Sequence, residues 1–160
     1  MHSLAALARV CGLKGEYQHA EVLYTIVLDT YRECCADTDL DLLHTAAQLA
    51  DMLRHQGSYL QAESLYISIL EKYRLVLGEA DEETLEVTSN LADTLRYAGK
   101  FSNAEPLYDA IVKHRQSTLG TADLRTIQAV NNLLTCCEGV GNKKKAAKTR
   151  ALLPALPGTS

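Results

Sequence analysis

The feature that most constrains this chain is a glycine that returns every 42 residues. Gly15, Gly57, Gly99 and Gly141 follow one another at this interval in the 160-residue sequence. Each lies between two stretches with helical spacing of apolar residues, where the chain must turn and glycine tolerates a positive φ. A fixed period of roughly 20–50 residues is typical of a solenoid, which stacks one supersecondary unit repeatedly. The period therefore predicts an all-α repeat protein.

Three side chains recur at fixed distances after each of the first three glycines. An aromatic residue placed to pack over the turn comes first, then an alanine where two helices approach closely, then a tyrosine. The alanine and the tyrosine are four residues apart and share one helix face. The three sets are Tyr17, Tyr59 and Phe101; Ala20, Ala62 and Ala104; and Tyr24, Tyr66 and Tyr108.

This pattern resembles the tetratricopeptide repeat (TPR). The longer period with Ala-Glu-x-Leu-Tyr resembles the subclass found in kinesin light chains and nephrocystin-3. The resemblance implies a right-handed α-α superhelical solenoid of about four antiparallel helix pairs over residues 1–153. We expect repeats at approximately 1–36, 37–78, 79–120 and 121–153, and a flexible C-terminal tail over 154–160.

Apolar residues at spacings of three and four predict the helices within each repeat. The connectors before the first helices are short and acidic, which suits a helix start. Ser102 is expected as an N-cap, with Glu105 completing a capping box. The predicted helices cover residues 3–13, 16–35, 39–55, 59–77, 82–98, 102–119 and 123–138.

Composition excludes several classes of function. The net charge of −4 argues against a nucleic-acid binder, and no run of 18 apolar residues is available to span a membrane. Five cysteines with two adjacent pairs make a poor disulfide framework, which favours a reducing, cytoplasmic setting. Cys11, Cys35 and Cys137 fall where other repeats carry leucine, so we expect small buried hydrophobes. Neither a metal nor a cofactor is expected.

The last predicted helix departs from the pattern because residues 143–150 are strongly basic. One interpretation is a patch that binds phosphate or a membrane surface. The other is a polar capping helix, which a solenoid needs where stacking ends. The shortness of the run and the acidic balance of the chain favour the cap.

In TPR proteins the first helices of the repeats line the concave surface, and the resemblance implies the same ligand groove here. Residues on these helices that lie opposite the packing stripe are then expected to contact a peptide. Arg9 has this phase in the first repeat. In the other repeats the predicted site comprises His44, Gln48, Asp51, Arg54, His55, Glu86, Asn90, Asp93, Arg96, Tyr97, Gln128, Asn131, Asn132 and Thr135.

Asn90 and Asn132 match the asparagine before Leu-Ala in kinesin-light-chain-like repeats, where such amides hold the backbone of an extended peptide. An amide suits this task because it both donates and accepts hydrogen bonds, and Gln48 can do the same. The alternative is that these are ordinary surface amides.

Arg54 and Arg96 lie one period apart, and a guanidinium group can fork onto carboxylates or stack on an aromatic side chain. They would therefore suit an acidic or acidic-aromatic peptide. The alternative is a solvated i,i+3 ion pair with Asp51 and with Asp93.

Catalysis finds no support, because no phosphate loop or nucleophile motif occurs and His44 and His55 lie about three turns apart. The expected function is a non-enzymatic protein-interaction module, an adaptor or scaffold, that binds a peptide segment of a protein partner. The alternative is a structural segment of a longer TPR array, or a module that self-associates through its first repeat. Leu4, Leu7 and Val10 motivate it, because no preceding helix covers them.

Overall fold

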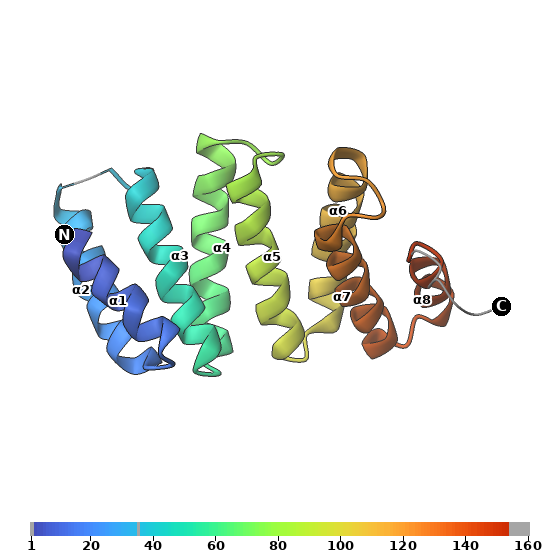
Figure 1. Ribbon diagram of the computed structural model, residues 1–160, viewed down its shortest axis with the longest axis horizontal. Helices are drawn as coiled ribbons and strands as arrows, with labels where there is room; N and C mark the ends of the chain where they lie inside the picture. Colours follow the sequence, from blue (N-terminus) through green and yellow to red (C-terminus); the bar gives the residue numbers. More distant parts are fainter. Residues whose placement is uncertain (1, 35, 154–160) are drawn as a thin grey trace. The chain divides into compact units, whose positions relative to one another are not determined.

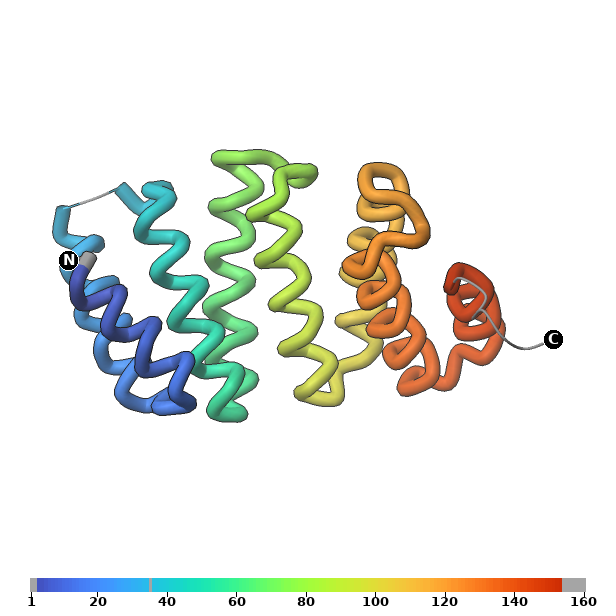
Figure 2. Tube along the Cα trace, viewed as in Figure 1, coloured from blue at the N-terminus to red at the C-terminus, as the bar shows by residue number. Residues whose placement is uncertain are grey.

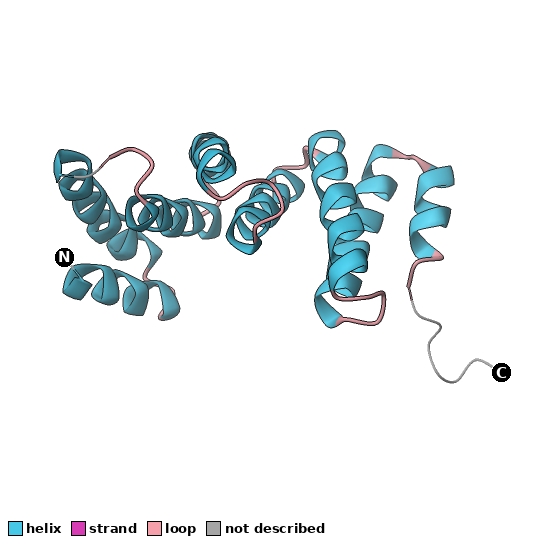
Figure 3. Cartoon of the chain, turned by 90° about the horizontal axis from the view of Figure 1, so that it is seen from above, coloured by secondary structure: helices cyan, strands magenta, loops and turns pink. Residues whose placement is uncertain are grey.

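The computed structural model describes residues 2–34 and 36–153, and most of these residues are helical. The expected burial of Cys35 and the expected flexible tail fall outside the described residues. Within them there are eight helices and no strand (Figure 1, Figure 3), so the predicted all-α fold is confirmed. The helices are α1 (His2–Leu13), α2 (Tyr17–Cys34), α3 (Leu40–His55), α4 (Tyr59–Val76), α5 (Glu82–Tyr97), α6 (Phe101–Thr118), α7 (Leu124–Val140) and α8 (Lys143–Arg150).

The chain divides into two compact units. The first, Met1–Thr94, contains α1 to α4 and most of α5, and the second, Leu95–Ser160, contains the end of α5 with α6 to α8. In the first unit each helix from α1 to α4 packs against the next, a succession that Figure 2 traces from blue to green. In the second unit α7 packs against both α6 and α8. The repeat boundaries given above stay a prediction.

The acidic connectors start the first helices of the later pairs. The Asp39 side chain accepts hydrogen bonds from the backbone N–H of Asp41 and Leu42 at 3.0 and 3.2 Å. Asp81 and Asp123, one and two periods further on, each accept from the backbone N–H two residues later at 2.9 Å. These bonds satisfy N–H groups that have no partner within the helix.

The recurring glycines end these helices in the left-handed conformation. Gly57 and Gly99 have φ of 81° and 75°, which a residue with a side chain adopts only under strain. The chain then re-enters a helix almost at once, and α6 begins at Phe101 after Lys100. Ser102 consequently lies inside the first turn, and the N-cap predicted there is wrong.

The recurring alanine and tyrosine form the core between the helices. Ala20, Ala62 and Ala104 are fully buried, and Tyr66 and Tyr108 are as well. In the second unit Ala146 continues the alanine series at 7% exposed, although Arg150 replaces the tyrosine. Burying a large apolar side chain contributes roughly 1.5–3 kcal/mol, so these positions carry much of the packing energy of each helix pair.

The basic helix α8 is held to its own unit by ion pairs. The ammonium of Lys145 lies 2.6 Å from a Glu105 carboxylate oxygen on α6 and 3.6 Å from Asp109. The hydrogen bond to Glu105 raises the pKa of Lys145, so the Lys145 ammonium stays protonated and keeps its positive charge. These contacts within the chain fit a polar capping helix.

Candidate functional site

The first unit contains a cavity of about 180 Å³ between α3, α4 and α5, called here the α3–α5 cavity. Five residues of the predicted site line it, and four further residues complete the wall. The predicted members are His44, Gln48, Asp51, Glu86 and Asn90; the others are Ala47, Tyr73, Glu83 and Val87. First-helix residues from two successive repeats therefore meet at one site.

A second cavity of about 370 Å³ lies between α1, α2 and α3 and is called the α1–α3 cavity. Gln48 and Asp51 line both cavities, so the two hollows adjoin at α3. Arg9 and His55, which the helical phase placed on this surface, also line the second one. The remaining wall consists of Gly12, Leu13, Tyr17, Tyr24 and Met52.

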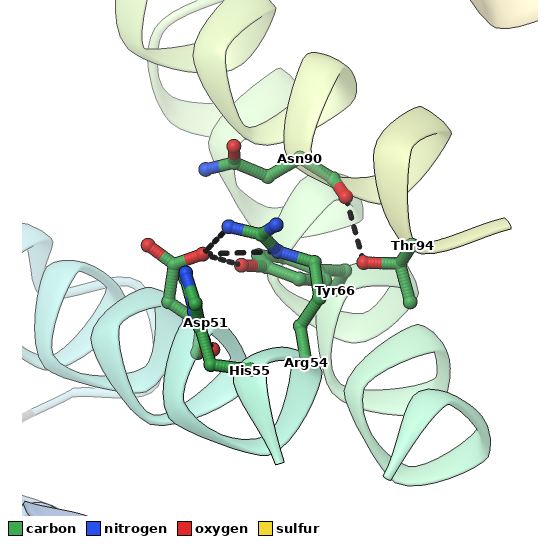
Figure 4. A network of polar contacts seen from close by, with 6 residues as sticks. All are labelled: Asp51, Arg54, His55, Tyr66, Asn90 and Thr94. Atoms are coloured by element: carbon green, nitrogen blue, oxygen red, sulfur yellow. Dashed lines mark hydrogen bonds and ion pairs between the residues drawn. The ribbon is translucent and has the colours of Figure 1, made fainter. Parts of the chain in front are cut away.

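The two amides of the α3–α5 cavity are available to a ligand. Gln48 on α3 and Asn90 on α5 are half-buried, and neither side chain makes a hydrogen bond to another described residue. Only the backbone carbonyl of Asn90 is used, by the Thr94 hydroxyl at 2.7 Å (Figure 4). Both amides therefore present a free donor and a free acceptor to the cavity.

Arg54 belongs to a network inside the first unit. Its Nε donates to Oδ1 of Asp51 at 3.2 Å, and the Tyr66 hydroxyl donates to the same oxygen at 3.0 Å (Figure 4). The Arg54 and Asp51 side chains are only 16% and 25% exposed. Burial lowers the pKa of Arg54, but the hydrogen bond and charge of Asp51 outweigh it and raise the pKa overall. The alternative of an i,i+3 ion pair with Asp51 is thus confirmed for Arg54, but the pair is largely shielded from water and not solvated, because Tyr66 bonds to Asp51 from the neighbouring helix.

His55 closes the end of α3 against α2. Its ring stacks on Tyr17 with centroids 5.0 Å apart, and its Nδ1 lies 2.8 Å from the Asp51 carbonyl oxygen. The aromatic residue expected to pack over the turn thus packs against the next first helix.

The other predicted site residues have separate surroundings. Asp93 is half-buried, as is Arg96, whose Nε donates to the Tyr108 hydroxyl at 3.4 Å and whose guanidinium lies 4.3 Å from the Tyr97 ring centroid. On α7, Gln128, Asn131 and Thr135 are exposed and Asn132 is half-buried. The Thr135 hydroxyl donates to the Asn131 carbonyl at 3.0 Å. That these residues contact a peptide stays a prediction.

Four lining residues lay outside the predicted set, and two of them, Glu83 and Tyr73, carry polar groups. Glu83 is one turn before Glu86 on α5, so extending the helical phase by one turn would have found it. Tyr73 lies on α4, a second helix, and no repeat signal assigns such a helix to the groove.

The buried cysteines behave as core residues. Cys136 and Cys137 are fully buried, which confirms the prediction for Cys137, whereas Cys11 is half-buried. Burial, followed by the charge of Glu105, raises the pKa of the Cys137 thiol. Among the described residues there is no group of three or more His, Cys, Asp or Glu side chains that could hold a metal ion.

Comparison with known proteins identifies the repeats. The tetratricopeptide repeat family matches residues 41–109. This segment consists of tetratricopeptide repeats. It runs from α3 into α6 and includes every residue that lines the α3–α5 cavity. No curated protein matches the sequence significantly.

Solved structures extend the TPR fold over nearly the whole chain. The nearly identical TPR-like repeats assigned to kinesin light chain in Podosopora anserina match with a TM-score of 0.86 at 18% identity, over 94% of this chain and 72% of that one. BtubC (BKLC) from P. vanneervenii matches with a TM-score of 0.77 at 23% identity, over 94% of this chain and 59% of that one. The predicted resemblance to the TPRs of kinesin light chains is thus confirmed in fold.

The TPR fold supports a protein-interaction module, since such repeats generally bind other proteins and are generally not enzymes. None of the helices in the described part of the chain is both long and apolar enough to cross a bilayer.

Proposed function

We propose that this TPR protein is a non-enzymatic adaptor that binds an extended peptide segment of a protein partner along the first helices of its repeats. The observation that carries the proposal is the pair of free amides, Gln48 and Asn90, on the wall of one cavity. Partly buried polar groups without a partner are costly unless a ligand or water completes their hydrogen bonds. An extended peptide supplies both the carbonyl oxygens and the N–H groups that these amides need.

The adjoining α1–α3 cavity supports the same proposal because it lengthens the surface. Tyr17 and Tyr24 give that end an aromatic wall, next to the charged Arg9. A peptide that crosses α3 at Gln48 would contact both cavities. A cytoplasmic setting, in which the buried cysteines stay reduced, is part of this proposal.

The test is selection of nine-residue peptides from a random display library on the whole chain. Recovered peptides are then measured by fluorescence anisotropy with Gln48→Ala/Asn90→Ala. We expect this variant to weaken binding at least tenfold. The matched control is Gln61→Ala/Asn103→Ala, which removes two exposed amides on the second helices α4 and α6 and should leave binding unchanged. Failure to recover any binding peptide, or equal binding by the two variants, would contradict the proposal.

A second candidate function, self-association, is favoured by one face of α1. Leu4, Leu7 and Val10 are 39%, 50% and 43% exposed. One period later Ala46, Leu49 and Met52 are 4%, 9% and 8% exposed on α3, which packs against α2. We propose that a second copy of the chain covers the α1 face. Light scattering should then show a dimer that Leu7→Glu dissociates, and a monomer at every concentration would reject this candidate.

A further inference from the structure

The α3–α5 cavity carries carboxylates but no basic side chain other than histidine. Asp51, Glu83 and Glu86 line it, whereas neither lysine nor arginine is among the lining residues. Asp51 is already paired with Arg54. Glu83 and Glu86 make no ion pair with any residue that the structure describes. Two exposed carboxylates without an ion-pair partner in the described chain therefore lie three residues apart on α5, at the wall of one hollow.

A buried phenol on the same wall independently indicates a ligand. Tyr73 of α4 is 1% exposed and lines the cavity, yet its hydroxyl makes no hydrogen bond within the described part of the chain. Its oxygen is not among the fully buried side-chain atoms that lack a partner, which in the described chain are the hydroxyls of Thr84 and Thr126. The hydroxyl therefore opens onto the cavity and is available to a group that enters it. Tyr66 on the same helix shows the contrast, because its hydroxyl is bonded to Asp51.

The surroundings of Tyr73 are electrically negative. Burial, followed by the charges of Glu83, Glu86 and Asp81, raises the pKa of Tyr73 to about 12. The phenol therefore stays protonated at neutral pH, with its oxygen able to accept a hydrogen bond from a cation.

The size of the cavity limits what can enter it. A volume of about 180 Å³ is below the roughly 300–1,000 Å³ of a typical small-molecule or cofactor pocket. The α3–α5 cavity is therefore large enough for one long side chain. A long basic side chain can extend its apolar stem along Val87 and Ala47 while its charged end reaches the carboxylates.

We propose that the α3–α5 cavity binds a lysine or arginine side chain of the partner peptide, so that this protein recognises a basic segment. The inference rests on the proposed peptide-binding function and names the chemistry of its ligand. Glu83 and Glu86 accept charge-assisted hydrogen bonds from the cation, and Tyr73 offers its hydroxyl oxygen. Gln48 and Asn90 hold the peptide backbone on either side. This reverses the ligand charge expected from Arg54, because Arg54 is paired with Asp51 and does not line the cavity.

The library selection described above also tests this inference. We expect recovered peptides to be enriched in lysine or arginine at one position, and replacing that residue by glutamate should weaken binding at least tenfold. Glu83→Gln/Glu86→Gln should remove most of this preference, and Tyr73→Phe should weaken binding about threefold. The control Glu33→Gln/Glu71→Gln changes the net charge equally at exposed sites on α2 and α4 and should keep the preference.

The outcomes separate this inference from the function on which it rests. If peptides bind through Gln48 and Asn90 but are acidic, or if Glu83→Gln/Glu86→Gln keeps the preference for a basic residue, the inference is wrong and the proposed function stands. If removing the two amides has no effect, the proposed function itself fails.

A small probe tests the cavity without any library. Acetyl-arginine methylamide should shift the side-chain amide NMR signals of Gln48 and Asn90, and acetyl-glutamate methylamide should not. The arginine-induced shifts should disappear in Glu83→Gln/Glu86→Gln, whose circular dichroism melt shows whether it is folded. Equal shifts with both probes, or no shift with arginine, would overturn the inference.

Discussion

The α3–α4 pair in the first unit and the α7–α8 pair in the second use the same repeat positions to join their helices by different chemistry. Arg54 and Tyr66 correspond, two periods later, to Glu138 and Arg150. In the first unit Asp51 joins Arg54 to the buried Tyr66 hydroxyl. In the second unit Arg150 pairs directly with Glu138 at 2.7 Å, and these side chains are 66% and 53% exposed. Both helix pairs are joined by polar side chains at these positions, but only the contacts in the first unit are shielded from water.

At a second pair of repeat positions the two units differ in the size of the side chains, and not in their charge. Tyr17 stacks on His55 in the first unit, and the corresponding residues of the second unit are Phe101 and Gly139. A Cβ atom added to Gly139 would lie 2.5 Å from the Phe101 ring. The ring therefore occupies the space that the His55 side chain takes in the first unit. In both comparisons the same repeat positions keep two helices in contact. The charge and the size of the two contacting residues, however, differ from one repeat to another.

The largest effect should come from reversing the shielded charge. Arg54→Glu places a carboxylate beside Asp51 in a poorly hydrated interface, so we expect the free energy of unfolding to fall by about 2–4 kcal/mol in urea denaturation. The matched change in the second unit, Glu138→Arg, faces Arg150 in water and should cost about 1 kcal/mol or less. Equal losses for the two variants would show that burial does not distinguish the pairs.

The next largest loss of stability should come from placing histidine, the residue at position 55 of the first unit, at the corresponding position 139 of the second. Gly139→His forces a side chain into the Phe101 ring, and we expect a loss of about 1–3 kcal/mol from overpacking. Thermal melts of Gly139→His, Phe101→Ala and the double variant form a cycle that measures the clash. The double variant should be more stable than the sum of the two single losses predicts. Simple additivity would mean that the two positions do not compete for space.

Alkaline pH should weaken the first unit's network. Burial and the charge of Asp51 raise the pKa of Tyr66, and the pKa of Tyr73 is raised to about 12. Unfolded tyrosine ionises near pH 10, so above that pH the unfolded chain loses protons that the folded chain retains, and the free energy of unfolding falls. Urea midpoints from pH 9 to 12 should fall less for Tyr66→Phe and Tyr73→Phe than for wild type. Arg150→Ala leaves both phenols in place and should follow wild type; identical slopes for all four proteins would contradict the shift.

The smallest effect should come from removing the exposed pair. Arg150→Ala deletes an ion pair between two largely solvated side chains, and we expect a change within about 1 kcal/mol that shrinks as salt is added. Chemical denaturation at low and high ionic strength measures it. A loss well above 2 kcal/mol would mean that this pair contributes as much as the shielded one.

Several parts of the candidate site could be predicted from the helical phase alone. The phase placed His44, Gln48 and Asn90 on one surface, and all three line the α3–α5 cavity. The spacing offered the Arg54–Asp51 ion pair but could not show that the pair is shielded from water, because that depends on a tyrosine twelve residues away on the next helix. Nor could it find Tyr73, since the position of a second-helix side chain beside the cavity depends on how α4 packs against α3.

The sequence by itself determined the repeat and its helices. Glycine at each 42-residue step stops a helix because only glycine takes its positive φ without strain, and the aspartate before each later first helix caps it through bonds to nearby N–H groups. Both effects are local. The tertiary structure decided which charges are available to a ligand. Arg54 pairs with Asp51 on its own helix, and Tyr66 of α4 bonds to that pair where water is largely excluded, whereas Glu83 and Glu86 make no ion pair with any described residue. The spacing offers an ion pair, but the helices packed beside it decide how far water weakens it.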